Sequence, residues 1–346
     1  MRSIKKKDKQ LEVRLATLRK WLQDAVEIEH ATIPPYLTAW LTIMDGHNRE
    51  AADIIKSVLL EEMLHLTLAA NILNAVGGSP DLVHPGFVPR YPHILPHSGG
   101  GFKIHIEKFS KKALKTFQKI EKPEASTAKP AGPGQFTSID QFYSAVAALI
   151  EKLCKTYGED AVFTGKKSLQ IQPEYFYGSG KVIVVHNLQT VRDAVKTIVD
   201  QGEGADHGLF DDDKTIFGEG DGHELAHYFR FNEIYKGKHY KAKDKPGKPT
   251  GSPISTDYDK VYPIKSDTDR SKIKAGPEII QALDDFANSY GELLKCLHLA
   301  FNGQPAQMNQ AMACMFAIRN RAQALIRTPL NKKVTIGLDY TQAGAK

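Results

Sequence analysis

The sequence predicts a mainly α-helical protein, a four-helix bundle with extra C-terminal helices and a long irregular insertion. In several long segments the apolar residues recur at intervals of three and four, the period of a helix with one buried face. Much of the stretch 77–187 is instead rich in Pro, Gly and aromatic residues and keeps little of that period. We therefore expect helices to form the core and the insertion to cover it.

A helical hairpin is expected at the start of the chain. Apolar periodicity predicts a first helix over 11–45 and a second over 49–76, with an Asp-Gly-His-Asn turn between them. A Gly-Gly-Ser-Pro string ends the second helix. Pro34 and Pro35 interrupt the first, and because each proline removes a backbone donor, we expect a kink there.

The same periodicity predicts the remaining helices, at 111–120, 138–157, 188–203, 222–236, 277–302 and 305–327. Those at 188–203 and 222–236 complete the bundle, and the last two are the extra C-terminal helices. Alternating apolar residues at 102–106 predict one short strand. No repeat of fixed period is found. We expect residues 1–346 to form a single domain, with the stretch 77–187 as an insertion in it.

Composition excludes several classes of protein. Lys and Arg number 46 against 40 for Asp and Glu, a net charge of +6 that is typical of a solvated surface rather than of nucleic-acid binding. The three cysteines lie in no CxxC motif, which disfavours disulfide scaffolds and Cys-ligated zinc and favours a reducing compartment. The N-terminus lacks an apolar signal region, and no apolar run approaches about 18 residues. We therefore expect a cytoplasmic protein without a membrane partner.

Two Glu-x-x-His motifs are the strongest chemical signal. Glu62 and His65 fall in the predicted 49–76 helix, and Glu224 and His227 in the 222–236 helix. Residues three apart lie one above the other on a helix, so each motif offers an oxygen and a nitrogen ligand in one direction. One such motif alone is usually a pair of solvated residues. Two on separate helices are the pattern of a dinuclear carboxylate site, which also needs one Glu from each of two further helices.

The first lone carboxylate is found by counting from the hairpin turn. Residues equally far from an antiparallel turn face each other, and this places Glu29 at the level of Glu62 and His65. Glu27 is about 200° round the helix from Glu29 and should point elsewhere. Because these positions lie among apolar residues, their ionisable groups need partners, and a metal ion would supply them.

The second lone carboxylate has rivals. Glu203 ends the 188–203 helix, across a polar loop from Glu224, and is the only Glu of that helix. Asp193 and Asp200 are the competing carboxylates. The complete set of predicted metal ligands is Glu29, Glu62, His65, Glu203, Glu224 and His227.

A zinc-protease motif overlaps the second pair. His223 and His227 flank Glu224 in the order His-Glu-x-x-His, which would bind one zinc ion with Glu224 as general base. A third ligand is missing, because Arg230 and Glu233 occupy the positions of the Gly and the third His in the extended motif. This alternative also leaves the ligands of the first hairpin unexplained.

The run Glu27-Ile-Glu-His-Ala-Thr-Ile-Pro-Pro-Tyr-Leu37 resembles the ferritin-like domain of iminophenyl-pyruvate dimer synthases, enzymes of violacein-type and indolocarbazole biosynthesis. The resemblance continues through 61–65, 120–124, 201–204 and 227–231, and covers the chain from about 20 to 330. It implies a ferritin-like four-helix bundle around dinuclear iron, for which Mn or Zn could substitute. Carried over position by position, it selects Glu29 rather than Glu27 and Glu203 rather than Asp200.

The resemblance implies a non-haem di-iron oxidase or oxygenase of secondary metabolism, acting with dioxygen on a small aromatic or amino-acid-derived metabolite. The segments 81–135 and 158–186 are expected to cover the metals with an aromatic-lined pocket. Tyr36, two turns after Glu29, either borders the site or packs in the core. Homo-oligomer formation stays open.

Other functions fit the same ligands. A ferroxidase would take iron itself as substrate, although the long insertion disfavours the compact bundle of a storage shell. A non-enzymatic module would keep the fold without the metals. A mononuclear metal protein or a haem protein are the remaining alternatives: the chain has no CxxCH motif for covalent haem, which leaves a noncovalent axial His.

Overall fold

The computed structural model describes residues 2–98, 102–123, 135–136, 138–178, 180–204, 208–211 and 224–341, with side chains from Lys9 onward. Its helices are α1 (Arg2–Thr42), α2 (Arg49–Ala75), α3 (Lys111–Ile120), α4 (Ile139–Tyr157), α5 (Glu159–Val162), α6 (Leu188–Glu203), α7 (His227–Lys236), α8 (Pro277–Phe301) and α9 (Gln307–Arg327), with 3₁₀ turns η1 (Lys167–Leu169) and η2 (Pro173–Tyr175). No strand occurs among these residues, and the predicted mainly helical class is confirmed.

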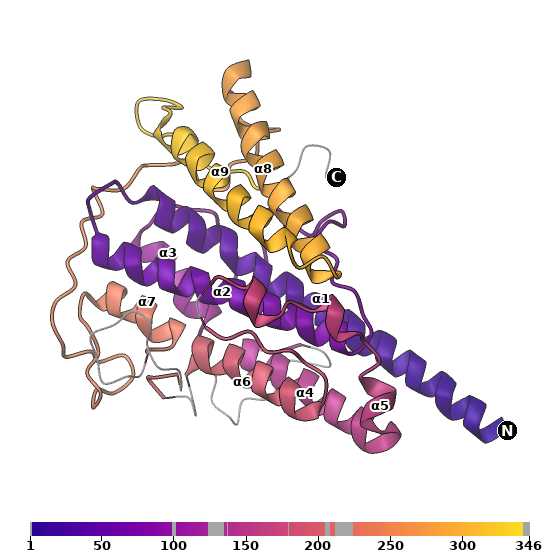
Figure 1. Cartoon of the computed structure of the whole chain (residues 1–346). Helices are drawn as coiled ribbons and strands as arrows, with labels where there is room; N and C mark the ends of the chain where they lie inside the picture. Colours follow the sequence, from indigo (N-terminus) through magenta and orange to yellow (C-terminus); the bar gives the residue numbers. More distant parts are fainter. Residues whose placement is uncertain are drawn as a thin grey trace.

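The α1–α2 hairpin is the middle layer of the molecule (Figure 1). The hairpin of α8 and α9 packs on one side of it, and α4, α6 and α7 lie on the other, with α3 against α7. Leu15, Leu18 and Leu22, on the predicted buried face of α1, are all buried. Because α2 has helices on both sides, it is buried along most of its length, including all of its polar residues from Glu61 onward.

The two prolines of α1 do not break the helix, which continues through Pro34 and Pro35 to Thr42. A proline at position 35 cannot donate to the carbonyl oxygen of Ala31, four residues earlier. The hydroxyl of Tyr91 donates to that oxygen instead, at 2.8 Å. A side chain of the insertion thus supplies the hydrogen bond that the helix lacks.

Two local predictions are wrong. The strand expected at 102–106 is absent, and Ile104 forms only an isolated antiparallel bridge with His93. The helix expected from 222 begins at His227, because the preceding residues pair with another segment. There the backbone N of Asp211 donates to the carbonyl oxygen of Glu224 at 2.9 Å, beside an isolated antiparallel bridge between Phe210 and Leu225 that competes with the helix.

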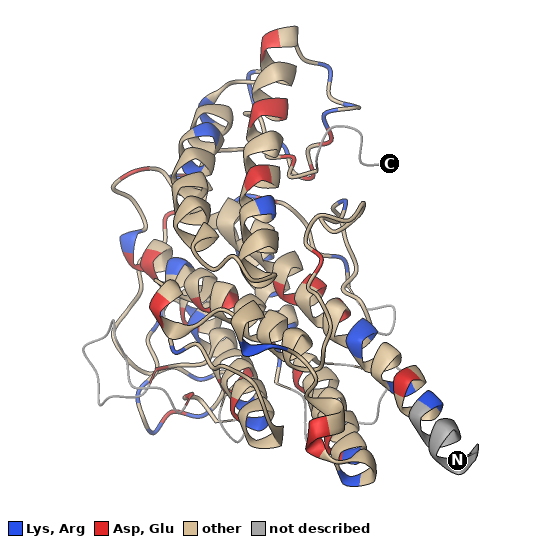
Figure 2. Ribbon diagram, turned by 45° about the vertical axis from the view of Figure 1, so that its right-hand side comes forward, with Lys and Arg blue, Asp and Glu red and all other residues tan. Residues whose placement is uncertain are grey.

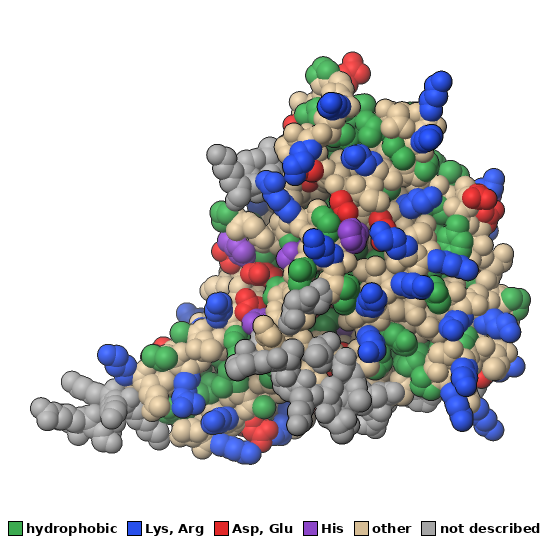
Figure 3. Space-filling view, turned by 180° about the vertical axis from the view of Figure 1, so that it is seen from behind, with side chains coloured by type: hydrophobic (Ala, Val, Ile, Leu, Met, Phe, Trp, Pro, Cys, Tyr) green, Lys and Arg blue, Asp and Glu red, His purple; other side chains and the backbone are tan. Residues whose placement is uncertain are grey.

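Charged side chains are interspersed over the surface. Figure 2 shows mainly acidic residues along α8 and basic residues along α9, so that the two signs of charge lie side by side on this hairpin. Figure 3 shows basic side chains scattered over the back face, with acidic residues and histidines between them. This is the distribution of an ordinary solvated surface. Among the described helices, none combines the length and the hydropathy that crossing a membrane requires.

Candidate metal centre

Five buried ionisable side chains meet where α2 faces α7 and the end of α3. They are Glu29 of α1, Glu62 and His65 of α2, Glu121 directly after α3, and His227, the first residue of α7. Glu62, His65 and His227 each offer one ligand atom, and these three atoms lie within 4.8 Å of one another. The two imidazole rings stack, with centroids 5.3 Å apart.

His65 is oriented by an amide. Its Nε2–H donates to Oε1 of Gln201 at 2.8 Å, which leaves the lone pair on Nδ1. Nδ1 lies 3.7 Å from Glu29 Oε2 and 3.7 Å from Glu62 Oε1. Burial, with the charge of His227 adding to it, lowers the pKa of His65 to about 3, so the ring is neutral. A neutral imidazole that turns its lone pair toward two carboxyl groups has the arrangement of a metal ligand with an outer hydrogen-bond partner.

His227 is oriented by a carboxylate. Its Nε2–H donates to Glu61 Oε2 at 2.9 Å. Nδ1 lies 2.9 Å from Glu62 Oε1 and 3.6 Å from Glu121 Oε2, but makes no hydrogen bond of good geometry. Burial alone would lower the pKa of His227, but the carboxylates of Glu121, Glu61 and Glu62 raise it well above its usual value. Without a metal, the ring carries a proton that a bound cation would replace.

Glu62 occupies the centre of the cluster. Its Oε1 faces both imidazoles, 3.7 Å from His65 Nδ1 and 2.9 Å from His227 Nδ1. Its Oε2 accepts a hydrogen bond from Thr32 Oγ1 at 2.8 Å. Burial and the nearby carboxylate of Glu121 raise the pKa of Glu62 to about 7. One carboxyl group is therefore within reach of ions bound to either imidazole.

The two outer carboxyl groups have matching surroundings. Tyr143 donates its hydroxyl hydrogen to Glu29 Oε1 at 2.6 Å, and Tyr36 donates to Glu121 Oε1. The second oxygen of each carboxyl group faces an imidazole. Burial and the carboxylate of Glu62 raise the pKa of Glu29 well above its usual value. Each tyrosine thus fixes the direction in which one carboxyl group can bind a cation.

Arg230 keeps Glu61 ionised behind the cluster. Its Nη1 and Nη2 donate to Glu61 Oε1 and Oε2 at 3.1 and 3.0 Å. Burial alone would raise the pKa of Glu61, but the guanidinium charge of Arg230 lowers it to about 2. Arg230 also forms ion pairs with Glu224 at 3.0 Å and Asp211 at 3.5 Å. A permanently charged Glu61 therefore holds the N–H of His227.

Comparison with known proteins agrees with the helical architecture. The family model described as ferritin-like matches residues 22–236, from within α1 to the end of α7. The chain belongs to the ferritin-like family. The solved structure of a ferritin-like protein from Caulobacter vibrioides has the same fold, with 20% sequence identity, a TM-score of 0.62, and coverage of 93% of this chain and 97% of that one. No curated protein matches the sequence.

Within this ferritin-like fold, four of the six predicted ligands come together: Glu29, Glu62, His65 and His227. Glu27 points elsewhere, as the helix register predicts, and its Oε1 lies 3.1 Å from His84 Nε2. The rival Asp200 pairs with Lys196 on the surface of α6. The ligand role of the four clustered residues stays a prediction.

The other two predicted ligands have different contacts. Glu224 does not share a helix face with His227, because α7 begins after it, and it pairs with Arg230. Glu203 is buried, and its Oε1 accepts a hydrogen bond from the backbone N of Asp140 at 3.0 Å, in the first turn of α4. His223, on which the zinc-protease motif depends, lies outside the described residues.

Sequence reasoning missed Glu121. It lies in the insertion, directly after α3, where its backbone N–H caps the helix. Its carboxyl group approaches Gly202 of α6 so closely that a Cβ at that glycine would lie 3.4 Å from Glu121 Oε2. The available signal was its place within 120–124, one of the segments that carry the family resemblance, but no helix-face spacing links Glu121 to the ligands of the bundle.

Proposed function

We propose that this ferritin-like protein is a metal-dependent oxidase or oxygenase with a dinuclear centre, acting on a small organic molecule as iminophenyl-pyruvate dimer synthases do. The observation that carries the proposal is the position of Glu62 between two imidazoles. Its Oε1 faces Nδ1 of both His65 and His227, and the remaining nitrogen of each ring is already bonded to a side-chain oxygen.

The donor set suits two divalent cations. Glu29, Glu62 and His65 would hold one ion, and Glu62, Glu121 and His227 the other. Carboxylate oxygens and imidazole nitrogens without thiolates are suited to iron, manganese and zinc. The buried Nδ1 of His227, which lacks a good hydrogen bond, supports a cation at this place. Iron bound there would supply redox chemistry with dioxygen, which the side chains alone cannot supply.

The protein's own residues would set the conditions for that chemistry. Gln201 and Glu61 hold the two imidazoles in the tautomer that turns Nδ1 inward. Tyr36 and Tyr143 hold the outer carboxyl groups through their hydroxyls. Because all five cluster residues are buried, bulk water is kept from the centre, which strengthens the electrostatic interactions within it.

Oxygen consumption by the reduced, iron-loaded protein tests this proposal. We expect the bound iron to be oxidised slowly in the protein alone and faster with an aromatic amine, imine or 2-oxo acid of indole size. Stopped-flow absorbance measures both rates. An anaerobic Fe(II) titration should end at about two ions per chain. If oxidation is fast, if no organic compound changes its rate, and if it continues over many added iron ions per chain, the protein is instead a ferroxidase.

A matched pair of variants separates the cluster from its surroundings. Glu62→Ala should abolish both iron binding and oxygen consumption, because Glu62 is the carboxyl group that both imidazoles face. Glu27→Ala, on the same hairpin but paired with His84, should retain both. Loss of iron from Glu27→Ala to the same extent would contradict the assignment.

A further inference from the structure

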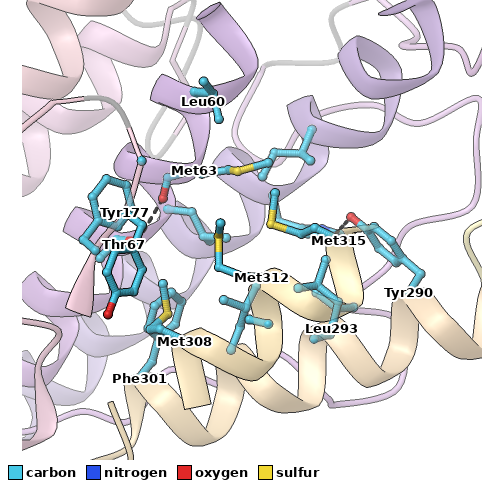
Figure 4. Close-up of a pocket in the computed structure, with 18 residues that line it drawn as sticks. Leu60, Met63, Thr67, Tyr177, Tyr290, Leu293, Phe301, Met308, Met312 and Met315 are labelled. Carbon is cyan, nitrogen blue, oxygen red and sulfur yellow. Dashed lines mark hydrogen bonds between the residues drawn. The ribbon is translucent and has the colours of Figure 1, made fainter. Parts of the chain in front are cut away.

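A cavity of about 120 Å³ lies on the side of the α1–α2 hairpin away from the metal cluster, against α8 and α9. Its wall comes mainly from these four helices, and only Phe176, Tyr177 and Gly178 come from the segments expected to cover an aromatic pocket. Figure 4 shows Met63 of α2 facing Met312 and Met315 of α9, with their sulfur atoms directed toward one another. Tyr177, at the edge of the cavity, is 58% exposed.

The wall is suited to an aromatic ring. No charged side chain lines the cavity among the described residues, so an ionised ligand would lose its hydration without a counter-charge. Thioether side chains are flexible and polarisable and contact aromatic rings favourably. An apolar cavity of about 150 Å³ in another protein stays dry and binds benzene. A space of similar size, walled by methionine and aromatic side chains, therefore fits one substituted ring.

One polar pair interrupts the apolar wall. His30 Nε2 and the Tyr290 hydroxyl are hydrogen-bonded at 2.9 Å, and both residues line the cavity. His30 is 1% exposed, and the described residues give its Nδ1 no hydrogen-bond partner. A buried polar atom without a hydrogen-bond partner is energetically unfavourable. A ligand with one hydroxyl or N–H group would give this pair the hydrogen bond that it lacks.

We propose that this cavity is a binding site for an uncharged small aromatic molecule that carries a single hydroxyl, amine or ring N–H group. The site is separate from the metal centre. On α2, Met63 lines the cavity while the adjacent Glu62 faces the metal cluster, and on α1 the adjacent residues His30 and Glu29 are divided in the same way. Consecutive helical residues are about 100° apart, so the hairpin separates the two sites.

Two isosteric probes test the site: p-cresol and p-xylene, which differ by a hydroxyl in place of a methyl group. Binding to metal-free protein is measured by calorimetry. We expect p-cresol to bind about 2- to 10-fold more tightly than p-xylene, the range of one net hydrogen bond. His30→Phe should remove that preference while retaining p-xylene. Equal affinity of both probes for the wild type would overturn the polar part of the proposal.

A second pair of variants locates the binding. Met312→Trp should fill the cavity and abolish binding of both probes, whereas Phe316→Trp, one turn further along α9 and 65% exposed, should bind like wild type. Circular dichroism and a cooperative unfolding transition in urea show that each variant is folded. Undiminished binding to Met312→Trp, or no binding to the wild type, would overturn the proposal. Because metal-free protein is used, neither result depends on the proposed oxidase activity.

Discussion

Glu61 and Arg230 form a two-point salt bridge directly behind the candidate metal centre, with N–O distances of 3.1 and 3.0 Å. Glu61 Oε2 is at the same time the acceptor for the Nε2–H of His227, 2.9 Å away. Glu61 is next in sequence to the candidate ligand Glu62, but the two carboxyl groups have different roles. One carboxyl group faces both imidazoles, and the other holds one imidazole in place.

Replacing Glu61 should weaken metal binding without removing a ligand. In Glu61→Gln, His227 keeps an acceptor but loses the charge that raises its basicity, and Arg230 is left without its main partner. Loss of such an outer partner lowers metal affinity by about 10- to 100-fold. Breaking a buried ion pair lowers stability by about 3–5 kcal/mol. Mn(II) affinity and urea unfolding measure the two effects.

The control for that substitution is Glu292→Gln. Glu292 pairs with Lys295 on α8, but both side chains are exposed. An exposed ion pair contributes about 0–1 kcal/mol, and no metal ligand is near. If the two variants lose Mn(II) affinity equally, Glu61 does not act through His227.

Glu121 and Glu224 separate the observed cluster from the predicted ligand set. Glu121→Ala should reduce the bound metal from about two ions to one, because only the ion beside His227 depends on it. Glu224→Ala should leave the metal content unchanged, since Glu224 contacts Arg230. Elemental analysis of the two metal-loaded variants gives the number of ions per chain and tests both expectations. Metal loss from Glu224→Ala alone would restore the Glu-x-x-His motif as the ligand pair.

The first hairpin could be predicted in detail because its turn is tight. Counting from a four-residue turn is accurate to about one residue, and this was enough to place Glu29 opposite His65 and to direct Glu27 away. The second motif could not be predicted in this way. Glu224 and His227 have helical spacing, but residues 224–226 pair with 209–211, and that tertiary pairing overrides the local pattern.

Glu121 shows a second limit of the sequence. It reaches the cluster because α3 packs against α7, a contact between segments about a hundred residues apart. Helical periodicity at 111–120 predicts the helix but not its partner. In the same way, the apolar cavity is formed by helices from opposite ends of the chain, so no local pattern indicates it.

Tyr91 should contribute to stability through the prolines of α1. Its hydroxyl donates to the Ala31 carbonyl that Pro35 cannot reach. Tyr91→Phe would leave this buried oxygen without a partner, and we expect a loss of about 1–3 kcal/mol in urea unfolding. Tyr177→Phe, at an exposed position, should change stability by less than about 0.5 kcal/mol. Equal effects would show that another group bonds the Ala31 carbonyl.

The buried charges of the cluster also determine how stability depends on pH. Glu29, Glu62 and His227 all have raised pKa values in the fold. Each group therefore holds its proton more tightly in the folded protein than in the unfolded chain. This contributes to the free energy of unfolding at low pH, and the contribution is lost as pH rises from the pKa of the unfolded chain to that of the folded protein. For Glu62 the loss falls between pH 4.5 and about 7. His65 and His30, whose pKa values are lowered to about 3, act in the opposite direction, but only below pH 6.5.

Above pH 6.5 the protonation of His65 and His30 no longer affects stability, and only the groups whose pKa is raised in the fold still contribute to its pH dependence. The metal-free protein should therefore lose stability as pH rises from 6.5, which thermal unfolding at pH values on either side of 6.5 measures. With Mn(II) bound, the trend should reverse, because the cation takes the place of the protons on Glu29, Glu62 and His227 and competes better as they become scarce. Glu62→Gln should remove the loss of stability that Glu62 itself contributes between pH 4.5 and about 7, which is roughly 3 kcal/mol. A metal-free protein whose stability rises steadily with pH would show that these carboxyl groups are already ionised in the fold, and that the cluster holds its charges without a cation.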